Sequence, residues 1–200
     1  MSQYDISRSI NLKIGGMEIV IRRIGEGIKR LKRSDKELNS ISKELFGELN
    51  LLIYAAISLS RVKDELIRIV LLDSFAIHAR SLLDFLYARE YKIERYPTTV
   101  IAEDFFDKPE DWRTIRPIET QILKNVLNKV NTQIAHLKFE RLLLEDRERE
   151  IGFRQITKEI TSVFKKFLDN VSESKLNKED RDIVEENIAQ GMNVLYATNT

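Results

Sequence analysis

The sequence contains no cysteine among its 200 residues. This absence excludes a disulfide scaffold, a thiolate metal site and a cysteine nucleophile, and it favours a reducing compartment. An excess of one charge sign is also lacking, because 33 basic side chains stand against 32 acidic ones. With a net charge of +1, no global field attracts the chain to nucleic acid or to an anionic membrane, so any such binding must be local.

Long apolar runs are absent as well. The most apolar window, residues 51–59, is far shorter than the roughly 20 residues that a membrane-spanning helix needs. The first residues also lack the basic stretch and apolar core of a signal peptide. We therefore expect a soluble cytoplasmic protein with no membrane partner.

Glycine and proline are scarce, with seven and three residues respectively, so long helices are expected. Apolar residues recur at helical spacing in five stretches, which predicts a mainly α protein: a bundle of about five helices over residues 34–200. The second stretch restarts near Ser60, runs to about Tyr91 and is apolar around most of its circumference, as in a helix at the centre of a bundle. The predicted helix starts are a Ser34–Glu37 capping box, Ser60, Pro117, the region before Phe153, and Asn177.

Residues 1–33 differ from the rest of the chain. Apolar residues alternate with polar ones on both sides of Gly15-Gly16, which predicts an N-terminal β-hairpin. An isolated hairpin is marginal in water, so this one must pack on the helices or pair with another chain. The basic connector at 22–33 has two interpretations, a solvated charged helix start or a set of phosphate contacts.

Residues 92–116 show no sustained periodicity. Acidic residues alternate there with Phe105, Phe106, Trp112 and two prolines. Long segments without secondary structure are uncommon in compact domains, so we expect this one to be functional or partly helical.

A polar strip lies on the second predicted helix, where Asp73, Arg80 and Asp84 fall within about 40° of one another. One interpretation is local: Arg80 and Asp84 form an i,i+4 ion pair, and His78 is a packing histidine that bonds to a neighbour. The other is that the strip faces the third helix and holds its polar groups in place.

The third predicted helix carries His136 on the flank of its apolar stripe, together with Lys129. If the helix continues to Arg141, this side chain points into the core and needs a carboxylate partner, for which Asp73 and Asp84 are the candidates. The alternative is that the helix ends near Phe139 and Arg141 turns outward.

The arrangement Asn131-Thr132-x-x-x-His136 within a helical bundle resembles the HEPN superfamily (higher eukaryotes and prokaryotes nucleotide-binding). The strings ARSLLDFLY and IAHLKFER, bridged by AEDFF and Trp112, also resemble a group of bacterial helical proteins. In active HEPN members an arginine four to six residues before a histidine supports metal-independent RNA cleavage between two subunits. The resemblance therefore implies a homodimer that binds RNA or a nucleotide, with His136 as the catalytic acid or base and with Arg141 or Arg80 as the source of positive charge. The candidate binding residues are Asp73, Arg80, Asp84, Lys129 and Asn131.

The sequence departs from the HEPN motif at Asn131, which stands where the family has its arginine. Lys129 supplies a cation at a longer spacing, but it lacks the bidentate fork of a guanidinium. We therefore expect an RNA- or nucleotide-associated protein, of a defence or toxin–antitoxin context, with weak or no cleavage. The alternative is an interaction module in which Asp73, Arg80, Asp84 and Arg141 form a buried network.

Metal and cofactor sites are not expected. The two histidines lie in no metal-binding spacing, and the glycine pairs lack the spacing and lysine of a phosphate-binding loop.

Overall fold

The computed structural model describes residues 9–14, 17–22, 33–88, 98–133 and 152–197, and of residues 9–14, 17–22, 127–129 and 131–133 it describes the backbone alone. This part of the protein is mainly α, as the sequence predicts. The elements in chain order are β1 (Ser9–Ile14), β2 (Met17–Arg22), α1 (Asp35–Leu59), α2 (Glu65–Leu86), the 3-10 turn η1 (Ala102–Phe105), α4 (Pro109–Ile115), α5 (Gln121–Gln133), α7 (Phe153–Leu168) and α8 (Lys178–Ala197).

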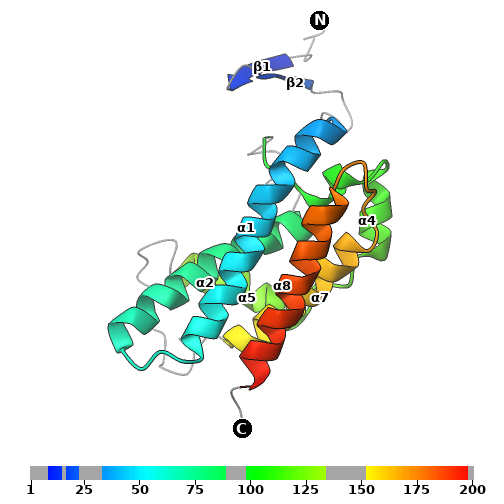
Figure 1. The fold of residues 1–200 in the computed structure, drawn as a ribbon. Helices are drawn as coiled ribbons and strands as arrows, with labels where there is room; N and C mark the ends of the chain where they lie inside the picture. The colour runs from blue at the N-terminus through cyan, green and yellow to red at the C-terminus, as the bar shows by residue number, and fades with distance from the viewer. Residues whose placement is uncertain (1–8, 15–16, 23–32, 89–97, 134–151, 198–200) are drawn as a thin grey trace, which may run out of the picture.

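The two strands β1 and β2 pair antiparallel, with Ile14 opposite Met17 and Ser9 opposite Arg22. In Figure 1 this two-stranded sheet lies beyond the N-terminal end of α1.

Helix α1 begins where its local sequence predicts. The Ser34 side chain accepts a hydrogen bond from the Glu37 backbone, and the Glu37 carboxylate accepts one from the Ser34 backbone. This reciprocal pair satisfies two backbone donors that the first turn would otherwise leave free. The apolar stripe of α1, which includes Leu38, Leu49 and Leu52, is fully buried. Helices α1 and α8 lie side by side in Figure 1, and α2 packs against α1 as the other half of a helical hairpin.

Helix α2 is shorter than the sequence predicts and only partly central. It starts after Asp64, whose carboxylate accepts a bond from the Ile67 backbone, and not at Ser60. It ends at Leu86 rather than near Tyr91. Its C-terminal half is buried, whereas large apolar side chains of its N-terminal half, Leu66 among them, are exposed. A central position for the whole helix is therefore wrong, because the neighbouring helices α5 and α7 cover only part of it.

The segment 98–116 is partly helical, which was one of the two predictions for residues 92–116. It contains η1 and α4, and Pro109 occupies the first turn of α4, where its missing N–H costs nothing. This segment delivers its aromatic side chains to the core. The buried rings of the resulting cluster are Phe85, Phe105, Phe106, Trp112, Phe164 and Phe167.

The remaining helices close the bundle around this core. Helix α7 buries a stripe that contains Ile160, Phe164 and Phe167. Helix α8 follows an Asn177 side chain that accepts a bond from the Glu179 backbone, so the predicted cap is present. None of the helices that the structure describes combines the length and the apolar character of a bilayer span.

Candidate functional site

The polar strip on α2 is present, and two of its three charged residues pair locally. Arg80 Nε lies 3.8 Å from Asp84 Oδ2, and both side chains are half-buried. Asp73, two turns before Arg80 and three before Asp84 on the same strip, is exposed. An i,i+4 pair of this kind contributes about 0.3–0.5 kcal/mol, so it orients the two side chains more than it stabilises the fold. The local interpretation of Arg80 and Asp84 therefore describes the structure.

His78 also behaves as the local interpretation predicts. Its Nδ1 lies 3.0 Å from Glu48 Oε2 of α1, and the imidazole is largely buried between the two helices. The contact joins α1 to α2 and occupies one ring nitrogen of His78. This histidine is therefore a packing residue at the α1–α2 contact, on a different side of α2 from Arg80 and Asp84.

A second polar cluster continues the strip at the end of α2. Tyr87 is the C-terminal cap of α2 and is only 7% exposed, while Arg116 caps the end of α4. The guanidinium carbon of Arg116 lies 5.6 Å from the centre of the Tyr87 ring, within the range of a cation–π contact. The sequence pattern alone did not indicate Arg116 as a site residue, because its contact with Tyr87 depends on how residues 98–116 turn back onto α2.

Burial dominates the electrostatics of this cluster. Burial is the main reason that the pKa of Tyr87 is raised to about 12; the nearby charges of Glu119 and Glu159 contribute to this rise, and Arg116 opposes it. Tyr87 therefore remains a neutral hydroxyl throughout the physiological pH range. Its Oη is buried and has no hydrogen-bond partner in the described structure, and the same holds for Nη1 of Arg116.

Two unpartnered buried donor groups this close together are unusual, because each costs free energy until an acceptor reaches it. A guanidinium and a protonated phenol both donate, so the complementary ligand atom is an oxygen acceptor such as that of a phosphate or a carboxylate. Glu119 and Glu159 stand beside these donors and accept from hydroxyl or amino groups. The cluster therefore suits a ligand that carries both an anion and neutral polar groups.

Helix α7 is tied to the start of α5 beside this cluster. The Thr120 hydroxyl donates to Glu159 Oε2, and the Gln155 amide donates to Glu159 Oε1. Thr120 Oγ1 also accepts a hydrogen bond from the Leu123 backbone and so caps α5. These bonds orient the Glu159 carboxylate toward the N-terminal end of α5.

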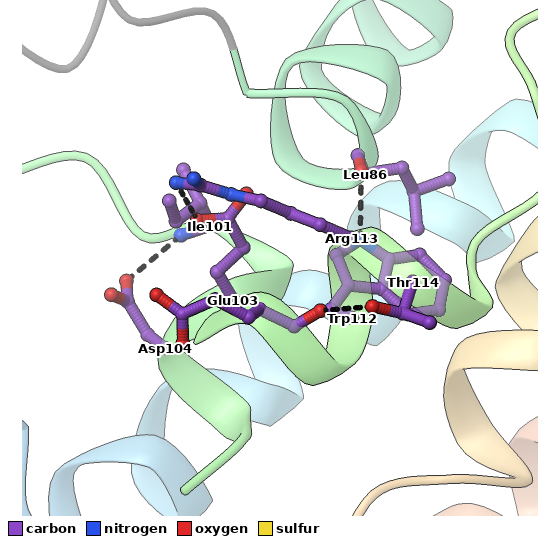
Figure 2. Close-up of polar contacts among 8 residues, drawn as sticks. Leu86, Ile101, Glu103, Asp104, Trp112, Arg113 and Thr114 are labelled. Carbon is purple, nitrogen blue, oxygen red and sulfur yellow. Dashed lines mark hydrogen bonds and ion pairs between the residues drawn. The ribbon is translucent and has the colours of Figure 1, made fainter. Parts of the chain in front are cut away.

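The segment that carries Arg116 is fastened to α2 by Trp112. This side chain is fully buried, and its Nε1 donates to the Leu86 carbonyl at 2.9 Å (Figure 2). Because Leu86 is the last residue of α2, the bond satisfies one of the carbonyls that a helix end leaves free. The position of Trp112 against this end of α2 also accounts for a helix that ends at Leu86 and not near Tyr91.

An ion pair braces the same segment from within. Both carboxylate oxygens of Glu103 accept bonds from Arg113, each at 2.8 Å, and Glu103 is buried while Arg113 is half-exposed (Figure 2). Asp104 accepts a bond from the Ile101 backbone and lies 3.7 Å from Arg33. The acidic residues of the AEDFF string therefore hold the backbone of residues 98–116 in place, which positions Arg116 over Tyr87.

The catalytic candidates His136 and Arg141 lie outside the described residues. Lys129 and Asn131 fall within α5, which packs against α2, but their side chains are also outside the described part. The pairing of Arg141 with Asp84 or Asp73 therefore remains a prediction. Among the described residues, no group of three histidine, aspartate or glutamate side chains is placed to hold a metal ion.

Comparison with models of protein families, with curated proteins and with solved structures found no match for this chain. The HEPN-like resemblance therefore rests on the sequence motifs alone.

Proposed function

We propose that the protein binds RNA or a nucleotide along the polar strip of α2, with Arg116 and Tyr87 holding a phosphate group. The observation that carries this proposal is the pair of buried donors, Tyr87 Oη and Arg116 Nη1, that have no partner in the described structure. A phosphate oxygen accepts from both donors, and a bound guanidinium and phenol then recover the free energy that their burial costs.

The mixed charge of the cluster favours a nucleotide or RNA over a bare anion. Arg80 lies two helical turns from Tyr87, a separation of about 10 Å at 1.5 Å per residue. A second phosphate in a chain reaches Arg80, whereas inorganic phosphate does not span this distance. Glu119 and Glu159 repel a second negative charge near Tyr87 but accept hydrogen bonds from ribose hydroxyls or base amino groups.

Cleavage is expected to be weak or absent in this proposal. A HEPN-like mechanism needs an arginine near His136 to stabilise the charge that develops on phosphorus. Asn131 stands in that position and carries no charge. His136 remains the candidate general acid or base, and Arg141 remains the candidate for the missing positive charge.

The test is RNA binding by the full chain, measured by fluorescence anisotropy with a labelled single-stranded RNA at several salt concentrations. Arg116→Gln is expected to weaken binding by roughly tenfold and to reduce its salt dependence, because one phosphate contact is lost. Arg61→Gln is the matched control, since Arg61 is exposed in the loop between α1 and α2. Equal loss in both variants, or no RNA binding by the wild type, would contradict the proposal.

RNA degradation with EDTA present separates binding from cleavage. We expect wild-type protein to bind labelled RNA without degrading it efficiently. Robust metal-independent cleavage that disappears in His136→Ala would show that the protein is an active RNase despite Asn131.

The alternative function is an interaction module without a ligand. The pairing of Arg80 with Asp84 and of His78 with Glu48 favours it, since both pairs are accounted for by contacts within the bundle. In this case Arg116→Gln lowers the free energy of unfolding and no nucleotide or RNA protects the wild-type protein against thermal unfolding.

A further inference from the structure

The two donors of the proposed phosphate site are closed off from solvent. Tyr87 Oη and Arg116 Nη1 are both buried, and so is Oε1 of Glu119. A phosphate oxygen cannot bond to either donor in this arrangement, because a hydrogen bond needs its acceptor within about 3 Å of the donor. Part of the cover over these atoms must therefore move before a ligand reaches them.

Residues 117–120, here called the strap, join the end of α4 to the start of α5 beside this cluster. Every residue from Pro117 to Ile122 is exposed or half-buried as a whole, and Ile118 is 90% exposed. The Glu119 carboxylate reaches inward, where its Oε1 is buried. A segment with so little apolar burial opens locally at a much smaller cost than the core.

The two ends of the strap are held with different firmness. On the α4 side, the Arg116 backbone donates to the Trp112 carbonyl at 2.8 Å, and the buried Trp112 indole is bonded to the end of α2. On the α5 side, Thr120 is exposed, and its hydroxyl donates to the Glu159 carboxylate of α7. Exposed hydrogen bonds belong to the least stable parts of a fold. The strap therefore opens from Thr120, while Arg116 stays on α4.

The strap also brings a negative charge to the site. After burial, the Glu119 charge is the largest contribution to the raised pKa of Tyr87, so this carboxylate lies close to the hydroxyl. A phosphate group on Tyr87 and Arg116 meets this anion at short range, and like charges repel strongly where water is excluded. Movement of the strap removes the cover and this repulsion together.

We propose that the strap is an autoinhibitory cover on the phosphate site and that the Thr120–Glu159 hydrogen bond is its latch. The ligand in this inference rests on the function proposed above, whereas the movement belongs to the chain alone. The closed strap holds Glu119 against the donors, and the open strap exposes Tyr87 beside an Arg116 that has not moved. Only the open state binds, so the association rate is proportional to its population.

Thiol labelling of the chain without ligand measures the opening, because the chain has no cysteine of its own. Tyr87→Cys is expected to react with an aromatic disulfide reagent through a local opening that low urea concentrations barely change. Leu82→Cys, at a fully buried position five residues earlier on α2, is expected to react only on global unfolding.

The latch is tested in the same assay. Adding Thr120→Val should speed the labelling of Tyr87→Cys roughly fivefold, since this substitution removes the latch and the cap of α5. Thr120→Ser keeps the hydroxyl and should restore the slow rate. Thr114→Val is the matched control, because the Thr114 hydroxyl makes an exposed hydrogen bond to the Glu110 carbonyl within α4 (Figure 2).

Stopped-flow binding of a labelled single-stranded RNA gives the second measurement. Thr120→Val is expected to raise kon by the same factor as the labelling rate and to leave koff unchanged. Glu119→Gln removes the competing charge and should also raise kon severalfold. Arg116→Gln should act mainly on koff, because it removes a contact of the bound state.

The two measurements separate the strap from the ligand. Labelling of Tyr87→Cys only on global unfolding, or at a rate that Thr120→Val does not change, would overturn the strap even if RNA binds. A wild type that binds no RNA contradicts the proposed function, and labelling still decides the strap. If Tyr87→Cys does not fold, exchange of the Lys124 amide, which donates to the Thr120 carbonyl at 3.0 Å, reports the opening in the wild-type chain. Exchange of this amide only on global unfolding would overturn the proposal.

Discussion

Replacing Tyr87 with phenylalanine should stabilise the protein, although tyrosine and phenylalanine in a core usually differ little. The Tyr87 ring is 7% exposed, and its hydroxyl is buried without a hydrogen-bond partner in the described structure. An unsatisfied buried hydroxyl costs roughly 1–3 kcal/mol relative to its hydrated state, and Tyr87→Phe removes that cost while keeping the ring over which Arg116 lies. We expect an increase of about 1 kcal/mol in the free energy of unfolding at pH 7. For a chain of this length, such an increase raises Tm by about 2–4 °C.

The pH dependence of the same variant gives an independent check. Because burial raises the pKa of Tyr87 to about 12, the folded state retains a proton that the unfolded chain releases near pH 10. The wild-type protein therefore keeps this stability below pH 10 and loses it as the pH rises through about 12, by on the order of 2 kcal/mol. Tyr87→Phe lacks this loss, so the difference in stability between the two proteins should widen over that interval.

Urea denaturation followed by circular dichroism measures both effects, with Tyr54→Phe as the control. Tyr54 is exposed, so the control should stay within about 0.5 kcal/mol of the wild type at every pH. A loss of stability in Tyr87→Phe at pH 7 would refute the reasoning, because it would mean that the hydroxyl has a partner in solution. If Tyr87 also binds phosphate, the stabilised variant binds RNA more weakly, which is the usual cost of removing strain from a functional site.

Three further predictions test the contacts that hold residues 98–116 and α8 in place. Trp112→Phe should lower the free energy of unfolding by about 1–3 kcal/mol in urea denaturation, since the last carbonyl of α2 loses its buried donor; an unchanged midpoint would contradict this. Arg113→Met should cost about 3–5 kcal/mol, and Glu103→Gln clearly less, because only the first leaves a buried charge beside an apolar group; equal losses would argue against this asymmetry. Gly191→Ala should raise neither helicity nor Tm, despite the better helix propensity of alanine, because the new methyl group collides with Ile53 of α1; a higher Tm would show that the two helices separate easily.

The candidate site was predictable only in part. The pairing of Arg80 with Asp84 follows from their spacing on one helix, so the sequence was enough to propose it. The contact of Tyr87 with Arg116 was not predictable, because it joins the ends of two helices through a segment without periodicity. One signal was available: Arg116 directly precedes Pro117, and the residue before a proline tends to end a helix.

Where the fold is concerned, the sequence by itself determined the features that depend on neighbouring residues. The scarcity of glycine and proline and the helical spacing of apolar residues gave the mainly α class, and side chains such as Ser34 and Asn177 fixed helix starts because they bond to backbone groups two or three residues away. The local pattern also predicted that α2 is apolar around most of its circumference. It did not predict which part of that circumference the other helices would cover.

The tertiary structure decided the rest, because coverage depends on where distant segments pack. Helices α5 and α7 bury the C-terminal half of α2 and leave Leu66 and Val70 exposed. Trp112 reaches the end of α2 from a segment more than twenty residues away and stops the helix at Leu86. Burial and the closeness of charges, not residue type, set the pKa of Tyr87 and leave its hydroxyl without a partner. A hydroxyl or an isoleucine has the same chemistry in any sequence, and only its surroundings decide whether it is buried with partners, buried without one, or exposed.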